Sequence, residues 1–132
     1  MVQAQLGYAS DHRGCGVAYC RLTSRVGERL VRVAFHIRRF AGLDEREVGY
    51  GAVTAVAGLL RERGIASVAF IVPDTRLVND VNEHGDVPAP LVLPYVYLGC
   101  ALNRFESFAL RAGDDRDLAQ RASAEVALQT AA

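Results

Sequence analysis

Acidic side chains that could bind a divalent cation are the first chemical feature of this sequence. Asp74 closely follows Ser67 to Val72, an apolar run rich in β-branched residues that is typical of a strand buried on both faces. Carboxylate oxygens are preferred Mg²⁺ ligands, so Asp74 is a candidate metal ligand. It is also a good N-cap for a helix that begins after Pro73, and we favour this interpretation. Asp11 in a turn and Asp117 at a helix start are explained without chemistry.

Cysteine and histidine give no second reactive site. The chain has 3 cysteines, an odd number, and none lies beside a histidine or another cysteine at the spacing of a zinc site. We expect them to be free and buried, at Cys15, Cys20 and Cys100. The 3 histidines lie at no recognisable spacing from a cysteine or serine nucleophile, which argues against a Cys/His hydrolase.

Arginines gather in one stretch that could meet a phosphate backbone. Arg32, Arg38 and Arg39, with Arg29 nearby, form the densest basic cluster of the chain. Solvated arginines on a strand are the simpler interpretation. The 15 basic and 15 acidic residues balance to a net charge of +0, so any binding of nucleic acid must be local, weak and sensitive to salt.

Length and composition favour one domain over residues 1–132. A chain of 132 residues with 51% hydrophobic side chains can build one core but not two comfortable ones. No apolar run reaches the length of a membrane span, and the first ten residues lack the pattern of a signal peptide. We therefore expect a cytoplasmic protein without a membrane partner.

Hydrophobic periodicity predicts the elements that must position these side chains. The first part alternates apolar and polar residues as in an antiparallel meander of three strands, expected at Gln5–Ser10, Cys15–Leu22 and Arg29–Arg38. The remaining strands are expected at Ser67–Val72 and Glu106–Arg111. Helical patterns separate and follow them, which favours an α/β fold with a five-stranded mixed sheet and helices on both faces.

The central helix has clear start and stop signals. Asp44 followed by Glu47 has the spacing of a capping box, and Gly64 supplies a C-cap. Three glycines lie inside this helix although each costs about 1 kcal/mol relative to alanine. We expect close backbone approach to the sheet or to a partner at these positions, which are Gly49, Gly51 and Gly58. The last helix is expected to be capped by Asp114 or Asp117.

This order of elements, together with three local strings, resembles the archaeal and reverse-transcriptase-like branch of type-1 ribonuclease H. The central helix of that family typically reads Ala-Glu-Tyr-x-Ala-Leu and ends in Gly-Ile, and the matching strings here are Val48–Val53 and Gly64–Ile65. The Asp-Ser-x-Leu-Val that follows the fourth strand of the family matches Asp74–Val78. The fifth strand matches Arg104–Arg111.

The resemblance implies a metal-dependent reaction, but most of the metal ligands are missing from this sequence. Ribonuclease H cleaves the RNA strand of an RNA/DNA hybrid with two divalent metals, held by four carboxylates. Carried over residue by residue, these four positions fall on Tyr8, Gly49, Asp74 and, near the end of the chain, Arg121. Only Asp74 is a carboxylate, and the Arg121 charge would repel cations. The family's Thr-Asn-Asn before the central helix reads Asp44-Glu45-Arg46 here.

We therefore expect a catalytically degenerate ribonuclease H-like domain that binds nucleic acid, as RNA/DNA hybrid or RNA, or a protein partner. A metal-dependent ribonuclease with a rearranged site and a structural dimerisation module are the alternatives. No cofactor is expected, and Mg²⁺ or Mn²⁺ is needed only if the residual site is active. A helix apolar nearly all round is either core or a homodimer surface, through Tyr95, Tyr97 and Leu98.

Overall fold

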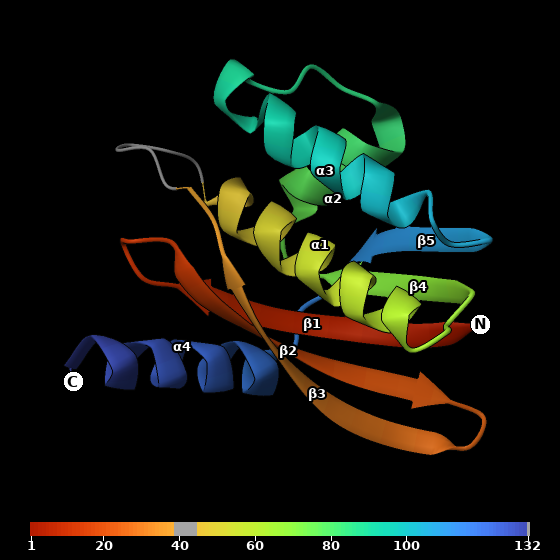
Figure 1. The fold of residues 1–132 in the computed structure, drawn as a ribbon, viewed down its shortest axis with the longest axis horizontal. Coiled ribbons are helices and arrows are strands. Elements are labelled where there is room, and N and C mark those ends of the chain that lie inside the picture. The colour runs from red at the N-terminus through yellow and green to blue at the C-terminus, as the bar shows by residue number, and fades with distance from the viewer. Residues whose placement is uncertain (39–44, 132) are drawn as a thin grey trace.

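A five-stranded mixed sheet forms the centre of the structure, a computed structural model that describes residues 1–38 and 45–131. The strand order is β3-β2-β1-β4-β5 (Figure 1). β1 pairs antiparallel with β2, as β2 does with β3, whereas β1 with β4 and β4 with β5 are parallel. The strands are β1 Val2–Ser10, β2 Cys15–Ser24, β3 Gly27–His36, β4 Ser67–Val72 and β5 Ser107–Ala112. The expected meander and parallel strands are confirmed.

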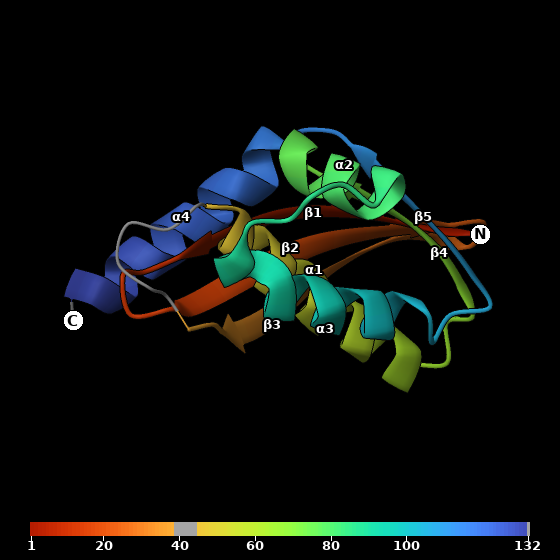
Figure 2. The ribbon, with the colours of Figure 1, turned by 90° about the horizontal axis from the view of Figure 1, so that it is seen from above.

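Helices cover both faces of the sheet, as expected. α1 (Arg46–Glu62) and α3 (Val92–Leu102) lie on one face and α4 (Arg116–Ala131) lies on the other (Figure 2). α2 (Thr75–Glu83) follows β4, and a short 3-10 turn (Ala89–Leu91) precedes α3. No helix in the described part of the chain is long and apolar enough to cross a membrane.

The main core lies between the sheet and α1. Leu6 of β1 and Phe70 of β4 are fully buried there against Val53 of α1. On the opposite face, Val17 of β2 packs against Ala122 of α4 in a smaller cluster. The alternation of strand side chains between the two faces therefore divides the buried residues into two layers.

Two of the three glycines expected to make close contacts do so. A Cβ on Gly49 would lie 2.7 Å from the Tyr8 hydroxyl, and one on Gly51 would lie 2.2 Å from Ile37. Gly58 has nothing within 4 Å of such a Cβ, so it makes no close contact with the described residues, and the approach of a partner at this position stays a prediction. Gly64, with φ of +81°, ends α1 as expected. The expected cap at Asp44 lies outside the described residues.

Two local expectations need correction. Asp115, and not Asp114 or Asp117, caps α4, because its Oδ1 accepts a hydrogen bond from the Leu118 N–H at 3.2 Å. The cysteines are free, but Cys20 alone is buried, and burial raises the pKa of its thiol to about 12. The other two are exposed because one lies beside the first hairpin turn and the other on the outer side of α3.

Candidate functional site

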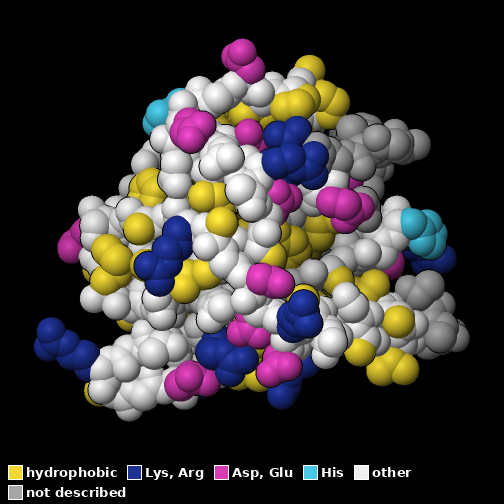
Figure 3. Space-filling model, turned by 180° about the vertical axis from the view of Figure 1, so that it is seen from behind, with side chains coloured by type: hydrophobic (Ala, Val, Ile, Leu, Met, Phe, Trp, Pro, Cys, Tyr) yellow, Lys and Arg dark blue, Asp and Glu magenta, His cyan; other side chains and the backbone are white. Residues whose placement is uncertain are grey.

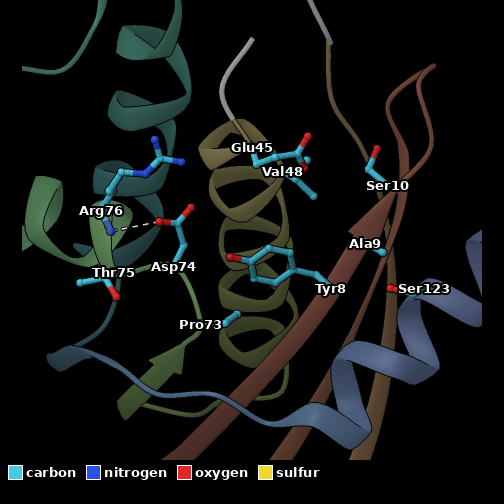
Figure 4. A pocket seen from close by; sticks show the side chains of 10 residues that line it. All are labelled: Tyr8, Ala9, Ser10, Glu45, Val48, Pro73, Asp74, Thr75, Arg76 and Ser123. Atoms are coloured by element: carbon cyan, nitrogen blue, oxygen red, sulfur yellow. Dashed lines mark hydrogen bonds between the residues drawn. The ribbon is translucent and has the colours of Figure 1, made fainter. Parts of the chain in front are cut away.

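A cavity of about 610 Å³ opens at the edge of the sheet where β1 and β4 end. These strands are parallel neighbours, so their carboxyl ends meet at the same edge. In open α/β sheets this is the place where ligands bind. The cavity, called the β1–β4 pocket below, is lined by Tyr8, Ala9, Ser10, Glu45, Val48, Pro73, Asp74, Thr75, Arg76 and Ser123 (Figure 4).

The Tyr8 phenol occupies the part of the pocket next to α1. Its hydroxyl lies where a side chain on Gly49 would begin, because a Cβ there would be 2.7 Å from Tyr8 Oη and 2.8 Å from Leu77 Cδ1. Figure 4 shows the ring extending from β1 toward α1. Burial, with the nearby carboxylates of Asp74 and Glu45, raises the pKa of Tyr8. The phenol therefore stays protonated at neutral pH.

Asp74 caps α2 and lines the pocket at the same time. Its Oδ1 accepts hydrogen bonds from the backbone N–H groups of Arg76, at 3.0 Å, and Leu77, at 3.2 Å. The favoured interpretation of Asp74 as an N-cap is confirmed. One carboxylate oxygen is thus engaged in holding the start of the helix.

The last helix contributes Ser123, and not the expected Arg121, to the residues that line the pocket. Successive helix residues turn by about 100°, so side chains two positions apart point in nearly opposite directions. Ala122 packs against the sheet, Ser123 lies on the pocket side, and Arg121 is exposed and does not line the cavity.

Glu45 is a pocket residue that sequence reasoning missed. It is the residue immediately before α1 and lines the same cavity as Asp74, and its carboxylate extends toward the side where Ser10 lies (Figure 4). In the family resemblance it belongs to Asp44-Glu45-Arg46, which precedes the central helix and to which no site role is assigned. Its position at a helix start was the available signal, because such residues cluster at this edge of the sheet.

A buried ion pair holds the two helices that frame the pocket. Asp80 of α2 accepts hydrogen bonds from Arg46 Nη1 at 3.0 Å and from Tyr50 Oη at 2.8 Å. Burial and then the hydrogen bond to Asp80 raise the pKa of Tyr50. Because Arg46 directly follows Glu45, this cluster fixes the start of α1 relative to α2 and so sets the width of the pocket.

The residues present do not fit a two-metal centre. Glu45 and Asp74 are the carboxylates that line the pocket, and Asp74 already caps a helix. No group of three or more His, Cys, Asp or Glu residues that could hold a metal occurs within residues 1–38 and 45–131. Two divalent ions need several convergent carboxylate oxygens. A protonated phenol and a serine hydroxyl do not replace them.

Of the three arginines expected to bind nucleic acid, the structure describes two, and these two have different surroundings. Arg32 binds Glu125 of α4 through its Nε, at 2.7 Å, and through Nη2. Arg38 lines a separate cavity beside α1, and Arg39 lies outside the described residues. On the face shown in Figure 3, arginines are interspersed with acidic side chains. These observations limit the electrostatic attraction available for a polyanion.

The proposed dimer surface on α3 is only partly exposed. Leu98 is fully buried against the core, so it cannot contact a partner, and this part of the expectation is wrong. Tyr95 is half-buried and packs edge-to-face on Tyr50, with ring centroids 6.4 Å apart. Tyr97 is 60% exposed and, with Leu93, lines a cavity of about 800 Å³ between β3, α1 and α3.

Known structures resemble this chain closely in fold but not in sequence. Ribonuclease H1 from the halophilic archaeon Halobacterium salinarum superposes with a TM-score of 0.73 at 19% identity, covering 97% of this chain and 98% of the other. An N-terminal ribonuclease H domain from Mycobacterium tuberculosis, solved as a fusion with maltose-binding protein, gives 0.72 at 13% identity over 92% and 94%.

A third structure, LC11 ribonuclease H1 in complex with an RNA/DNA hybrid, gives a TM-score of 0.71 at 12% identity, covering 94% of this chain and 92% of the other. No protein-family model and no curated protein matches the sequence. These similarities show that the chain has the ribonuclease H-like fold, which confirms the expected architecture.

Proposed function

We propose that this ribonuclease H-like domain binds nucleic acid at the β1–β4 pocket without cleaving it. The contact between Tyr8 and Gly49 carries the proposal. The helix position that supplies a metal-binding glutamate in the family has no side chain here, and the phenol of Tyr8 occupies the space beside it. A hydrolytic site would need carboxylates at both places.

The pocket offers donors for phosphate oxygens. Arg76 lines it together with the hydroxyl side chains of Ser10, Thr75 and Ser123. Arginine and hydroxyl groups supply many protein contacts to nucleic-acid backbones. A protein with this fold is known in complex with an RNA/DNA hybrid, which makes a hybrid the first ligand to test. The acidic pocket residues and the chain's net charge of +0 imply weak, salt-sensitive binding.

Two assays on the same preparation test the proposal. Protein with Mg²⁺ or Mn²⁺ should leave a labelled RNA/DNA hybrid uncut, and a fluorescence titration should show binding that weakens as salt rises. Arg76→Ala should reduce the affinity, whereas Arg63→Ala, an exposed position just past the C-terminus of α1, should not. Cleavage abolished by Asp74→Asn would contradict the first part. Equal binding by both arginine variants would contradict the second.

A ribonuclease with a rearranged site is the second candidate, and Glu45 favours it. Glu45 adds a second carboxylate to a pocket in which the sequence predicted one. Calorimetric titration with Mn²⁺ separates the candidates, because a rearranged site should bind the ion and lose it in both Glu45→Gln and Asp74→Asn. We expect no saturable binding, since two carboxylates are too few for the family's two ions.

Binding of a protein partner is the third candidate, and it is favoured by apolar side chains exposed on one side of α3. Their spacings of three and four positions place them together on the helix surface. They are Val92, Leu93, Val96 and Tyr97. Of the expected dimer residues, only Tyr97 belongs to this exposed group. A Tyr97→Asp variant that remains folded should lose such a partner.

A further inference from the structure

The outer edge of β3 is a long edge of the sheet. β3 pairs with β2 on one side, and no other strand of the described chain pairs with its opposite side (Figure 1). The ladder with β2 runs without interruption from Cys15 opposite His36 to Ser24 opposite Gly27. An edge strand of 10 residues presents a row of main-chain donors and acceptors to another chain.

The register identifies which residues face outward. Ile37 N–H donates to Gly14 O at 2.9 Å, in line with the β2–β3 ladder. Along a strand of an antiparallel pair, the main-chain N–H and C=O groups of one residue are directed at the paired strand, and those of the next residue are directed away from it. Odd-numbered residues of β3 therefore bond to β2, and even-numbered residues direct their N–H and C=O groups outward. Glu28, Leu30 and Arg32 belong to this outward set.

These three residues form a self-complementary pattern. Leu30, which is 43% exposed, lies midway between an acidic and a basic side chain on the same face of the strand. In an antiparallel pair of two β3 edges centred on Leu30, Glu28 lies opposite the partner's Arg32. Centring the pair on Arg32 or on Glu28 would instead place identical charges opposite each other. A shift by one position would place Leu30 opposite a charge.

We propose that β3 pairs along this edge with a second copy of the chain, in the register that places Leu30 opposite the partner's Leu30. Charges on an edge strand usually prevent such pairing, but here their order favours one partner, the same strand. In this register Val26, which is 98% exposed in the turn before β3, would lie near the partner's exposed Ala34.

The ion pairs already present on β3 extend this arrangement. Glu28 accepts from Arg21 at 3.1 Å, and Arg32 is held by Glu125 of α4. Pairing in the proposed register would join these two ion pairs across the interface. A closed two-fold arrangement also uses each edge once and leaves no further edge of this kind exposed. The proposal is independent of whether the β1–β4 pocket binds nucleic acid.

Charge reversal tests both the surface and the register. Glu28→Arg places two arginines opposite each other in a homodimer, and Arg32→Glu places two glutamates there. Each variant alone should dimerise roughly ten- to thirtyfold more weakly than the unmodified chain in sedimentation velocity. An equimolar mixture should recover the dimer, because its two chains carry opposite charges at every opposed position. Failure of the mixture to associate more strongly than either variant would overturn the register.

A cross-linking measurement decides the case if Arg32→Glu does not fold without its Glu125 contact. In a chain with both exposed cysteines replaced by serine, Leu30→Cys should be joined to its partner by a short bismaleimide. Ala34→Cys is the matched control, because the two copies of that position would be about 26 Å apart, eight residues along the strand. Only monomer at high concentration, equal cross-linking at both positions, or a dimer abolished by Tyr97→Asp would overturn the proposal.

Discussion

Replacing Gly49 with alanine tests whether the Tyr8 phenol truly fills the space beside α1. In a solvent-exposed helix this substitution stabilises a protein by about 1 kcal/mol, because alanine restricts the unfolded chain and favours the helix. Here the new Cβ would lie 2.7 Å from Tyr8 Oη and 2.8 Å from Leu77 Cδ1. Both contacts are roughly 1 Å shorter than an ordinary packing distance, so both side chains must shift.

The magnitude follows from two opposing effects. Adding a methyl group to a well-packed core typically costs about 1–3 kcal/mol. Subtracting the gain in helix propensity leaves Gly49→Ala destabilised by about 1 kcal/mol. Gly58 in the same helix is the matched control, because nothing lies within 4 Å of a Cβ built there. Gly58→Ala should therefore be stabilised, and the two variants should differ by about 2 kcal/mol in the free energy of unfolding.

Urea unfolding followed by circular dichroism measures both variants, and Tyr8→Phe completes the comparison. Removing the hydroxyl relieves one of the two short contacts, so alanine at position 49 should cost less in the Tyr8→Phe background. A Gly49→Ala variant that is as stable as Gly58→Ala would refute the reasoning. An unchanged penalty in the Tyr8→Phe background would show that Leu77 alone determines the cost.

Three further predictions concern contacts away from the pocket. Arg32 holds the pKa of Glu125 at about 2, below its ordinary value of 4.5, so this contact stabilises the fold above pH 4.5 and is lost as the pH falls toward 2. Arg32→Ala should lower the free energy of unfolding by about 1 kcal/mol at pH 7, a small loss because the arginine is 45% exposed. The loss should be smaller when unfolding is measured in acid, where Glu125 is protonated. Tyr50→Phe should lower the free energy of unfolding by about 2 kcal/mol, since it removes a buried hydrogen bond to the Asp80 carboxylate; an unchanged urea midpoint would contradict this. An aromatic disulfide reagent should modify two thiols of the native protein and reach Cys20 only on unfolding, and three fast reactions would show that the core opens readily.

The fold could be predicted because its elements carry strong local signals. Alternating residues mark β3, a short β-branched run marks β4, and Asp74 marks the start of α2. The position of Tyr8 beside Gly49 was also predictable, since the resemblance assigns both residues to positions of one site. Close contact at Gly49 followed from its cost inside a helix.

The site residues that the sequence did not predict correctly depend on how each helix is rotated about its axis and on tertiary packing. The apolar side of α4 is readable in the sequence and is buried, at Leu118, Ala122 and Val126. It does not show which neighbouring residue points toward the pocket, so the resemblance assigns Arg121 where the structure places Ser123. The helix α3 is apolar nearly all round, so its sequence indicates no preferred face, and the burial of Leu98 could not be foreseen. The position of Glu45 at a helix start was a usable signal, but only the packing of α1 against α2 shows that this residue lines the pocket.

The docking of α4 on β1 also bears on the order in which the chain acquires its structure. Tyr19 donates a hydrogen bond to Glu125 at 2.6 Å across 106 positions of sequence, and a Cβ on Gly7 would lie 2.4 Å from the backbone N of Ala119. The hairpins of the meander close over short loops, whereas this contact closes over most of the chain. Contacts of high sequence separation form late because they carry the largest loop-closure entropy. We therefore expect one face of β1 and β2 to stay open to solvent until α4 docks, so that a nascent or truncated chain exposes this surface to chaperones and to other chains.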